Sequence, residues 1–224
     1  MGTHSLSIQH VFNRGVRRSD IYHSDEDYRR FYNLLRWYTK IDYPYSVYLQ
    51  RINQAKRFGV SQGDVYRSIA QYYSYAKTPV SIFAWAFMNN HFHMVISEHV
   101  ERGITMFLHR ISTAYATYFN RKYEYTGSLF ESNYKSVEVT DERQLLYVIR
   151  YVHLNPVAAG LVDTNSVDDY AWSSWSEYRN PNDREILDRS LFDEFGISDE
   201  VVVQSVLDKK DTEDNEGYSN LLIG

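Results

Sequence analysis

The 224-residue sequence contains no cysteine. Disulfide frameworks and thiolate zinc sites are therefore excluded, and any metal must be held by histidine, carboxylate or amide groups. No apolar run approaches the roughly 18 residues that a membrane span needs. The N-terminus also lacks the basic-then-apolar plan of a signal peptide. We therefore expect a cytoplasmic protein with no membrane partner.

Several catalytic motifs are missing as well. The sequence has no Gly-rich phosphate loop, no Gly-x-Ser-x-Gly turn and no His-Glu-x-x-His helix. Nucleotide hydrolysis, serine-esterase chemistry and zincin-type proteolysis thereby lose most of their support.

Charge is distributed unevenly along the chain. Residues 1–160 hold 19 Lys+Arg and 13 Asp+Glu, whereas residues 161–224 hold 5 and 16. A basic body followed by an acidic end favours a nucleic-acid partner. The 21 tyrosines agree with this, because bases stack on such rings. A tyrosine-rich core and surface is the simpler explanation of the tyrosines taken alone.

Hydrophobic periodicity predicts alternating strands and helices. We expect strands near residues 5–12, 80–87, 92–97 and 134–139, and helices near 28–37, 65–75, 103–119 and 142–152, with Pro156 ending the last helix. Residues 41–78 form an expected helical insertion. This order predicts an α+β fold, a ferredoxin-like split βαβ antiparallel sheet with helices on one face. We expect a domain over 1–162 and an acidic, partly mobile extension over 163–224.

His91 and His93 form the first candidate site. Residues two apart in a strand point to the same face, so these imidazoles could bind one divalent cation side by side. Phe92 would then point into the opposite layer. Two surface histidines on an exposed strand would give the same pattern.

The expected helix after residue 142 supplies a second candidate. Tyr147 and Tyr151 lie four residues apart on one helix face, and Asn155 lies one turn further along it. A tyrosine on a helix is usually part of the core or its rim, so spacing alone does not choose a nucleophile.

Basic residues interleaved with aromatic residues form the third candidate. The basic residues are Arg14, Arg17, Arg18, Arg121, Lys122 and Lys135. This arrangement suits single-stranded nucleic acid, with charges on phosphates and rings under bases. An ordinary polar surface is the alternative interpretation.

These motifs occur in the order found in a known family. The chain resembles the single-tyrosine HUH transposases and, among them, the REP-associated tyrosine transposases. The matching blocks are residues 8–15, 88–96, 118–121, 127–131, 134–136 and 151–162. The sequence departs from the family pattern at Asn89, where proline is usual, and at Asn133, where relatives often carry arginine.

The resemblance implies a role for each candidate residue. His91 and His93 would be the paired metal ligands, with Asn155 as a third ligand. Tyr151 would be the nucleophile, with Tyr147 in reserve. The implied cofactor is Mg²⁺ or Mn²⁺, both of which accept amide oxygen.

The implied activity is cleavage and rejoining of single-stranded hairpin DNA through a 5′-phosphotyrosyl intermediate. The six basic residues would contact the single-stranded or hairpin DNA, and we expect a monomer, with a dimer as the alternative. Three other functions stay open. One is a non-catalytic nucleic-acid-binding module derived from a transposase, and another is a metal-dependent phosphodiesterase in which water attacks. The third is a structural or partner-binding protein that uses the acidic tail.

Overall fold

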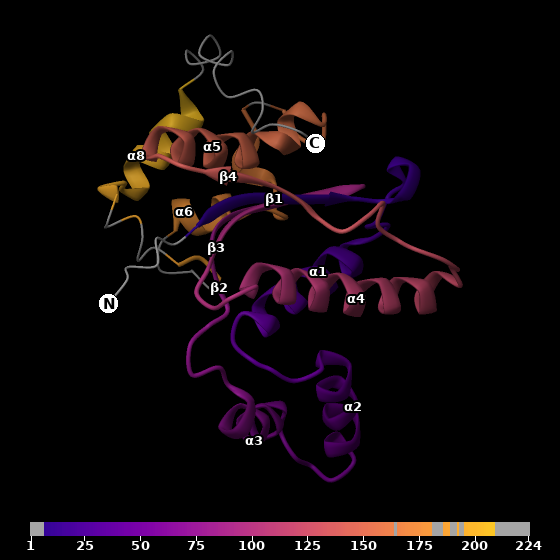
Figure 1. Ribbon diagram of the computed structural model, residues 1–224. Coiled ribbons are helices and arrows are strands. Elements are labelled where there is room, and N and C mark those ends of the chain that lie inside the picture. The colour runs from indigo at the N-terminus through magenta and orange to yellow at the C-terminus, as the bar shows by residue number, and fades with distance from the viewer. Residues whose placement is uncertain (1–6, 164, 181–185, 189–191, 193–194, 209–224) are drawn as a thin grey trace.

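A four-stranded antiparallel sheet lies at the centre of the computed structural model (Figure 1). The structure describes residues 7–163, 165–180, 186–188, 192 and 195–208. The strand order is β2-β3-β1-β4, with bounds β1 Ile8–Arg14, β2 Val80–Met88, β3 His91–Glu98 and β4 Lys135–Val139. Helices separate β1 from β2 and β3 from β4, whereas β2 and β3 form a hairpin. This is the split βαβ arrangement, so the predicted fold class is confirmed.

The register of β1 against β3 decides which side chains share a face. Phe12 lies opposite His93, and Arg14 lies opposite His91. Since side chains alternate along a strand, the two histidines point to one face and Phe92 points to the other. Phe92 packs there against Phe31, with ring centroids 5.1 Å apart. The prediction that Phe92 points into the opposite layer is confirmed.

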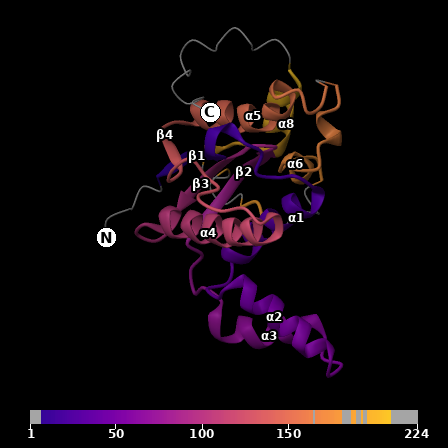
Figure 2. The ribbon, with the colours of Figure 1, turned by 90° about the vertical axis from the view of Figure 1, so that its right-hand side faces the viewer.

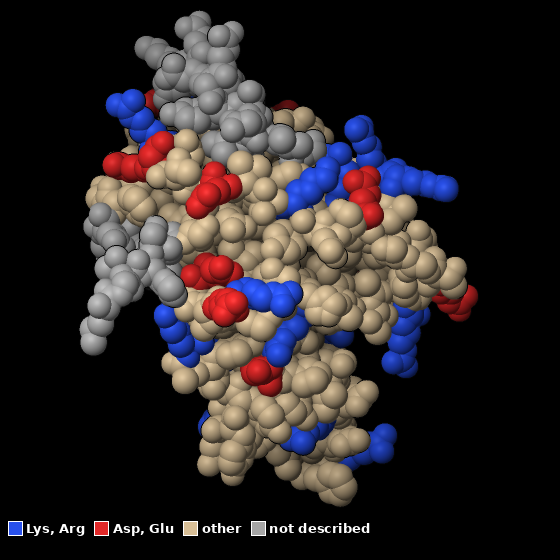
Figure 3. Space-filling view, in the orientation of Figure 1, with Lys and Arg blue, Asp and Glu red and all other residues tan. Residues whose placement is uncertain are grey.

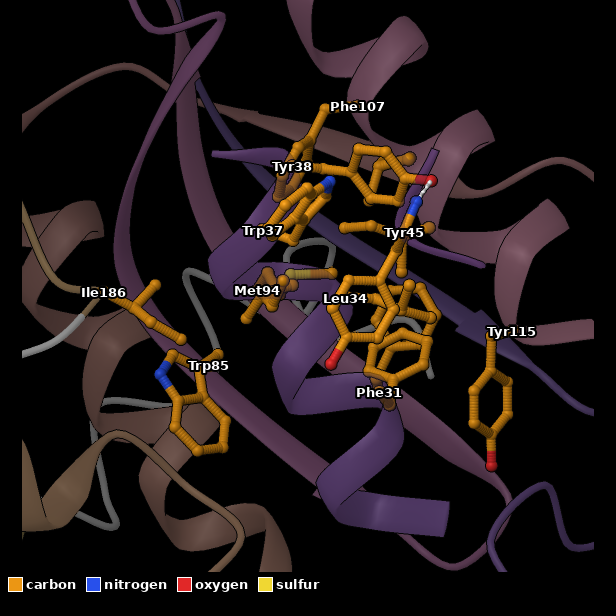
Figure 4. Packing of buried hydrophobic residues seen from close by; sticks show 14 of the residues in the cluster. Phe31, Leu34, Trp37, Tyr38, Tyr45, Trp85, Met94, Phe107, Tyr115 and Ile186 are labelled. Atoms are coloured by element: carbon orange, nitrogen blue, oxygen red, sulfur yellow. Dashed lines mark hydrogen bonds between the residues drawn. The ribbon is translucent and has the colours of Figure 1, made fainter. Parts of the chain in front are cut away.

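One face of the sheet is covered by α1 (Asp25–Tyr38) and α4 (Gly103–Tyr123) (Figure 1). Acids follow Ser24 in the first turn of α1, where they interact favourably with the helix dipole. The apolar side of α1 enters an aromatic core around Phe31 and Tyr115 (Figure 4). This layer is close-packed and supplies much of the molecule's buried apolar surface.

The opposite face is covered by α5 (Glu142–Ala158), which packs on β2 and β3. The expectation of helices on one face only is therefore wrong, because β1, β2 and β3 are largely buried on both faces and a second layer covers them.

The expected end of α5 at Pro156 is also wrong, since the helix runs through Pro156 to Ala158. Val152 and Pro156 are both buried. Continuous packing of this apolar side offsets the missing proline N–H.

Residues after 162 contribute to the same layer. They form η2 (Val167–Asp169), α6 (Trp175–Arg179) and α8 (Asp199–Leu207). Trp175, Tyr178 and Val202 are buried in one cluster with Val148 and Val152 of α5. The described part of the extension thus packs against α5. Residues 209–224 of this extension, which we expected to be partly mobile, lie outside the described residues.

The predicted helical insertion forms α2 (Tyr45–Lys56) and α3 (Gln62–Tyr73). The two helices pack together and project away from the sheet (Figure 2). Ser61 caps α3, because its hydroxyl accepts the N–H of Asp64 at 3.1 Å. Among the described residues, no helix has the length and apolar character of a membrane span.

Candidate functional site

The predicted histidine pair lies on the sheet face that α5 covers. His93 is completely buried, and its ring centroid lies 5.1 Å from that of His91. His10, from the neighbouring strand β1, is also completely buried. The Nε2 atom of His10 and the Nδ1 atom of His93 share a hydrogen bond of 2.8 Å. Sequence reasoning identified His91 and His93 but gave His10 no role.

Tyr151 of α5 lies over this histidine cluster. Its ring centroid is 5.5 Å from that of His93 and 5.7 Å from that of His10, in edge-on contacts. Asn155 lies one helical turn later and is buried, and its amide nitrogen donates to the Tyr151 carbonyl at 3.1 Å. Tyr147, one turn before Tyr151, is half-buried against the α5 cluster, and burial raises its pKa.

His91 is oriented by its neighbour in the chain. Its Nδ1 atom lies 2.5 Å from the side-chain oxygen of Asn90. An amide oxygen only accepts hydrogen bonds, so Nδ1 of His91 carries the proton and Nε2 keeps its lone pair. The amide nitrogen of Asn90 donates to the carbonyl of Arg18 at 3.0 Å, which fixes the orientation of the Asn90 side chain.

Both predicted ligands are neutral at pH 7. Burial lowers the pKa of His91 to about 4, and the charge of Arg14 acts in the same direction. Burial also holds the pKa of His93 well below its usual value, with further lowering by His10, His91 and Arg14. Neutral imidazole is the form that binds metals.

The donor atoms fit a divalent cation. The Nε2 atom of His93 is buried without a hydrogen-bond partner. Such an atom is costly unless something occupies its lone pair. Within the described part of the chain, no cluster of three or more His, Asp or Glu side chains could hold a metal. A cation at the histidine pair would therefore need an oxygen from elsewhere, and the side-chain oxygen of Asn155 is suitable.

The basic loop after β1 is tied to the residues that precede His91. Gly15 N–H donates to the Asn90 carbonyl at 2.8 Å, and Ile21 N–H donates to the Asn89 carbonyl at 2.8 Å. A side chain at Gly15 would meet the Ser19 carbonyl at 2.2 Å, so only glycine permits this fold-back. The loop forms η1 (Val16–Arg18), in which Arg17 and Arg18 adopt left-handed backbone angles (φ 56° and 61°).

Two predicted DNA-contacting residues lie beside His91. Arg14 and Lys135 line one small pocket with His91 and Glu131. Arg17 and Arg18 are exposed on η1, at the end of β1. Lysine and arginine side chains gather at this end of the molecule in Figure 3, where Figure 1 places η1.

The other two predicted contacts are located across the sheet. Arg121 lines a groove between α1 and α4, away from Tyr151. Lys122 forms ion pairs with Asp27 at 2.8 Å and Glu26 at 2.9 Å. We leave Lys122 out of the proposed DNA contacts, because a phosphate would have to displace a buried carboxylate partner.

His153 faces away from the histidine cluster. It is buried, and its Nε2 atom lies 2.8 Å from the Ser174 hydroxyl oxygen. Burial lowers its pKa to about 3. His153 thus links α5 to the C-terminal extension, two residues after Tyr151.

Residues 45–155 match the model of the family described as Transposase IS200 like. The resemblance to this transposase family is confirmed. The matched segment includes His91, His93, Tyr151 and Asn155. Among solved structures, the chain is similar to one described as the REP associates tyrosine transposase bound to a REP hairpin. The two chains are 14% identical, with a TM-score of 0.48 and coverage of 78% of this chain and 79% of that one. No curated protein matches the chain.

Proposed function

We propose that the chain is a divalent-metal-dependent transesterase that cleaves and rejoins single-stranded hairpin DNA with Tyr151 as nucleophile. The observation that carries this proposal is the contact of Tyr151 with buried His93, whose ring centroids are 5.5 Å apart. The match to the IS200-like transposase family supports the same assignment.

His91, His93 and the amide oxygen of Asn155 would hold Mg²⁺ or Mn²⁺. The chemistry supplied by the bound cation is polarisation of the scissile phosphate and compensation of its developing charge. The cluster itself is closed from solvent at His93, so its polar contacts are worth more than the same contacts in water.

The covalent step balances without another reactant. The phenolic oxygen of Tyr151 forms a bond to phosphorus while the bond from phosphorus to the 3′ oxygen breaks. The phenol loses its proton, and the leaving oxygen gains one. The products are a 3′-hydroxyl and DNA joined to Tyr151 through its 5′ phosphate. Attack by another 3′-hydroxyl reverses the step and rejoins the strands, because the covalent link conserves the phosphodiester energy.

The DNA contacts closest to this chemistry are Arg14, Arg17, Arg18 and Lys135. These cations would position the strand through phosphate contacts, which carry no sequence information. Arg121 lies farther from Tyr151, on the other side of the sheet. It would contact only DNA that extends around the sheet. The contact of Tyr151 with His93 within one chain supports a monomer as the active form.

The test is adduct formation with a labelled hairpin oligonucleotide in Mg²⁺ or Mn²⁺, followed by denaturing electrophoresis. We expect a covalent protein–DNA adduct that falls by at least roughly a thousandfold in Tyr151→Phe. Tyr147→Phe is the matched control, since it removes the same hydroxyl one turn away and should keep the adduct.

Three outcomes would contradict the proposal. An adduct that survives Tyr151→Phe but not Tyr147→Phe would move the nucleophile to Tyr147. Metal-dependent cleavage without an adduct would indicate attack by water. Tight hairpin binding without cleavage would indicate a binding module.

A further inference from the structure

The buried hydrogen bond between His10 and His93 has only two possible proton arrangements. In one, Nε2 of His10 donates and the proton of His93 resides on its Nε2. In the other, Nδ1 of His93 donates to His10, and Nε2 of His93 keeps a lone pair. The 2.8 Å separation fits both arrangements, so the surroundings of His93 must decide between them.

The surroundings of His93 favour donation by His93. Its Nε2 atom is buried without a hydrogen-bond partner. An N–H at this position would be an orphaned buried donor, which proteins rarely tolerate and which costs about 1–3 kcal/mol. A lone pair at the same position is a metal ligand. His91 already has the corresponding arrangement, because Asn90 accepts from its Nδ1 atom.

We infer that His10 is a positioning residue that holds the Nδ1–H tautomer of His93 and so presents the Nε2 lone pair of His93 to the cation. The two ligands would then offer the same nitrogen, one oriented by Asn90 and the other by His10. This inference rests on the proposed metal site but does not depend on DNA cleavage.

The rings around this hydrogen bond restrict its geometry. The imidazoles of His10 and His93 are inclined by only 21°, with centroids 5.0 Å apart. Phe12 contacts both rings, at 5.4 Å from His10 and 5.5 Å from His93. Tyr151 closes the cluster from α5. His93 therefore cannot turn freely toward another acceptor, and the identity of residue 10 determines its tautomer.

The direct measurement is the tautomer of His93 in metal-free, ¹⁵N-labelled protein at neutral pH. Long-range proton–nitrogen correlation spectra distinguish the two ring nitrogens, and His93→Gln identifies the signals by their loss. We expect a protonated Nδ1 and an unprotonated Nε2. A protonated Nε2 in the natural protein would overturn the inference, whatever the DNA assays show.

The second measurement is Mn²⁺ affinity by calorimetry, with no DNA present. Outer-shell partners of ligating histidines typically change affinity by roughly 10–100-fold. We expect a loss of that size in His10→Phe, which keeps an aromatic ring but has no acceptor. His10→Gln should retain affinity within a few-fold, because its side-chain oxygen can accept from Nδ1.

Each failure has a distinct meaning. Equal Mn²⁺ affinity in His10→Phe and the natural protein would overturn the positioning role, as would a natural protein that binds no Mn²⁺. Loss of the Tyr151 adduct alone, with the expected tautomer and affinities intact, would overturn the proposed DNA chemistry and leave the role of His10 standing.

Discussion

Asp27, between α1 and α4, and His93, beneath α5, are both completely buried polar groups on opposite faces of the sheet. Asp27 is surrounded by donors, which are His23 N–H, Ser24 Oγ, Tyr118 Oη, Lys122 Nζ and Tyr123 Oη at 2.7–3.0 Å. His93 has one partner, His10, and a second nitrogen without any. The Asp27 carboxylate is thus satisfied within the fold, whereas the Nε2 atom of His93 leaves a buried polar atom available to a ligand.

The aromatic layer between α1, α4 and the sheet should be the more sensitive of the two faces. Phe31→Ala removes a completely buried ring that contacts Phe87, Phe92 and Tyr115. We expect a loss of about 3–5 kcal/mol in the free energy of unfolding, measured by urea denaturation. Tyr151→Phe is the control on the other face and should cost less than about 1 kcal/mol. Equal losses would mean that the Tyr151 hydroxyl contributes as much to stability as the buried Phe31 ring.

The contribution of Asp27 to the free energy of unfolding should depend on pH. Burial alone would raise its pKa, but hydrogen bonds from Lys122, Tyr123 and Tyr118 outweigh burial and hold the pKa at about 2. A carboxyl with a lowered folded pKa stabilises the protein above its unfolded pKa, near 4, and loses that contribution as the pH falls toward 2. We expect Asp27→Asn to remove on the order of 2 kcal/mol of this acid-dependent stability.

The measurement is the free energy of unfolding between pH 5 and pH 2 for the natural protein and Asp27→Asn. Glu26→Gln is the matched control, because Glu26 is exposed and shares the same Lys122. Parallel curves for the natural protein and Asp27→Asn would show that Asp27 is not a stabilising charge.

The smallest expected effect is on hairpin-binding affinity, and it tests which surface of the protein contacts the DNA. Lys135→Ala should weaken hairpin binding a few-fold and reduce the slope of log affinity against log salt by about 0.7, the value for one phosphate contact on a single strand. Arg121→Ala, across the sheet, should leave the slope unchanged if the DNA stays beside His91. The reverse result would place the DNA in the groove between α1 and α4.

Local properties of the sequence were enough to predict the strands, most helices and the shared face of His91 and His93. Alternation along a strand needs no knowledge of its neighbours. The sequence alone gave no role to His10, because its contact with His93 depends on the pairing of β1 with β3. This pairing brings together residues 83 positions apart. The alternation of Ile8, His10 and Phe12 was the available signal, but it gave no register.

Two further features depend on residues far apart in the sequence. Lys122 was predicted as a DNA contact without sight of its ion-pair partner Asp27, which lies 95 positions earlier in the chain. Pro156 looked like a helix end because local rules dominate until packing is known. Spacing could not choose between Tyr147 and Tyr151, which share a helix face. Contacts between residues far apart in the sequence shape these features, and no short sequence window contains such contacts.

The turn at Asn89 and Asn90 joins the basic loop to the start of β3 through backbone and side-chain hydrogen bonds. Its consequence for engineering is a separation of tasks. Replacing Arg17 or Arg18 would alter the affinity for a nucleic acid and leave the histidine cluster unchanged. Replacing Asn90 would alter both together, since one side chain orients His91 and anchors the loop. Variants meant to tune nucleic-acid affinity should therefore change the arginines and keep Asn90 constant.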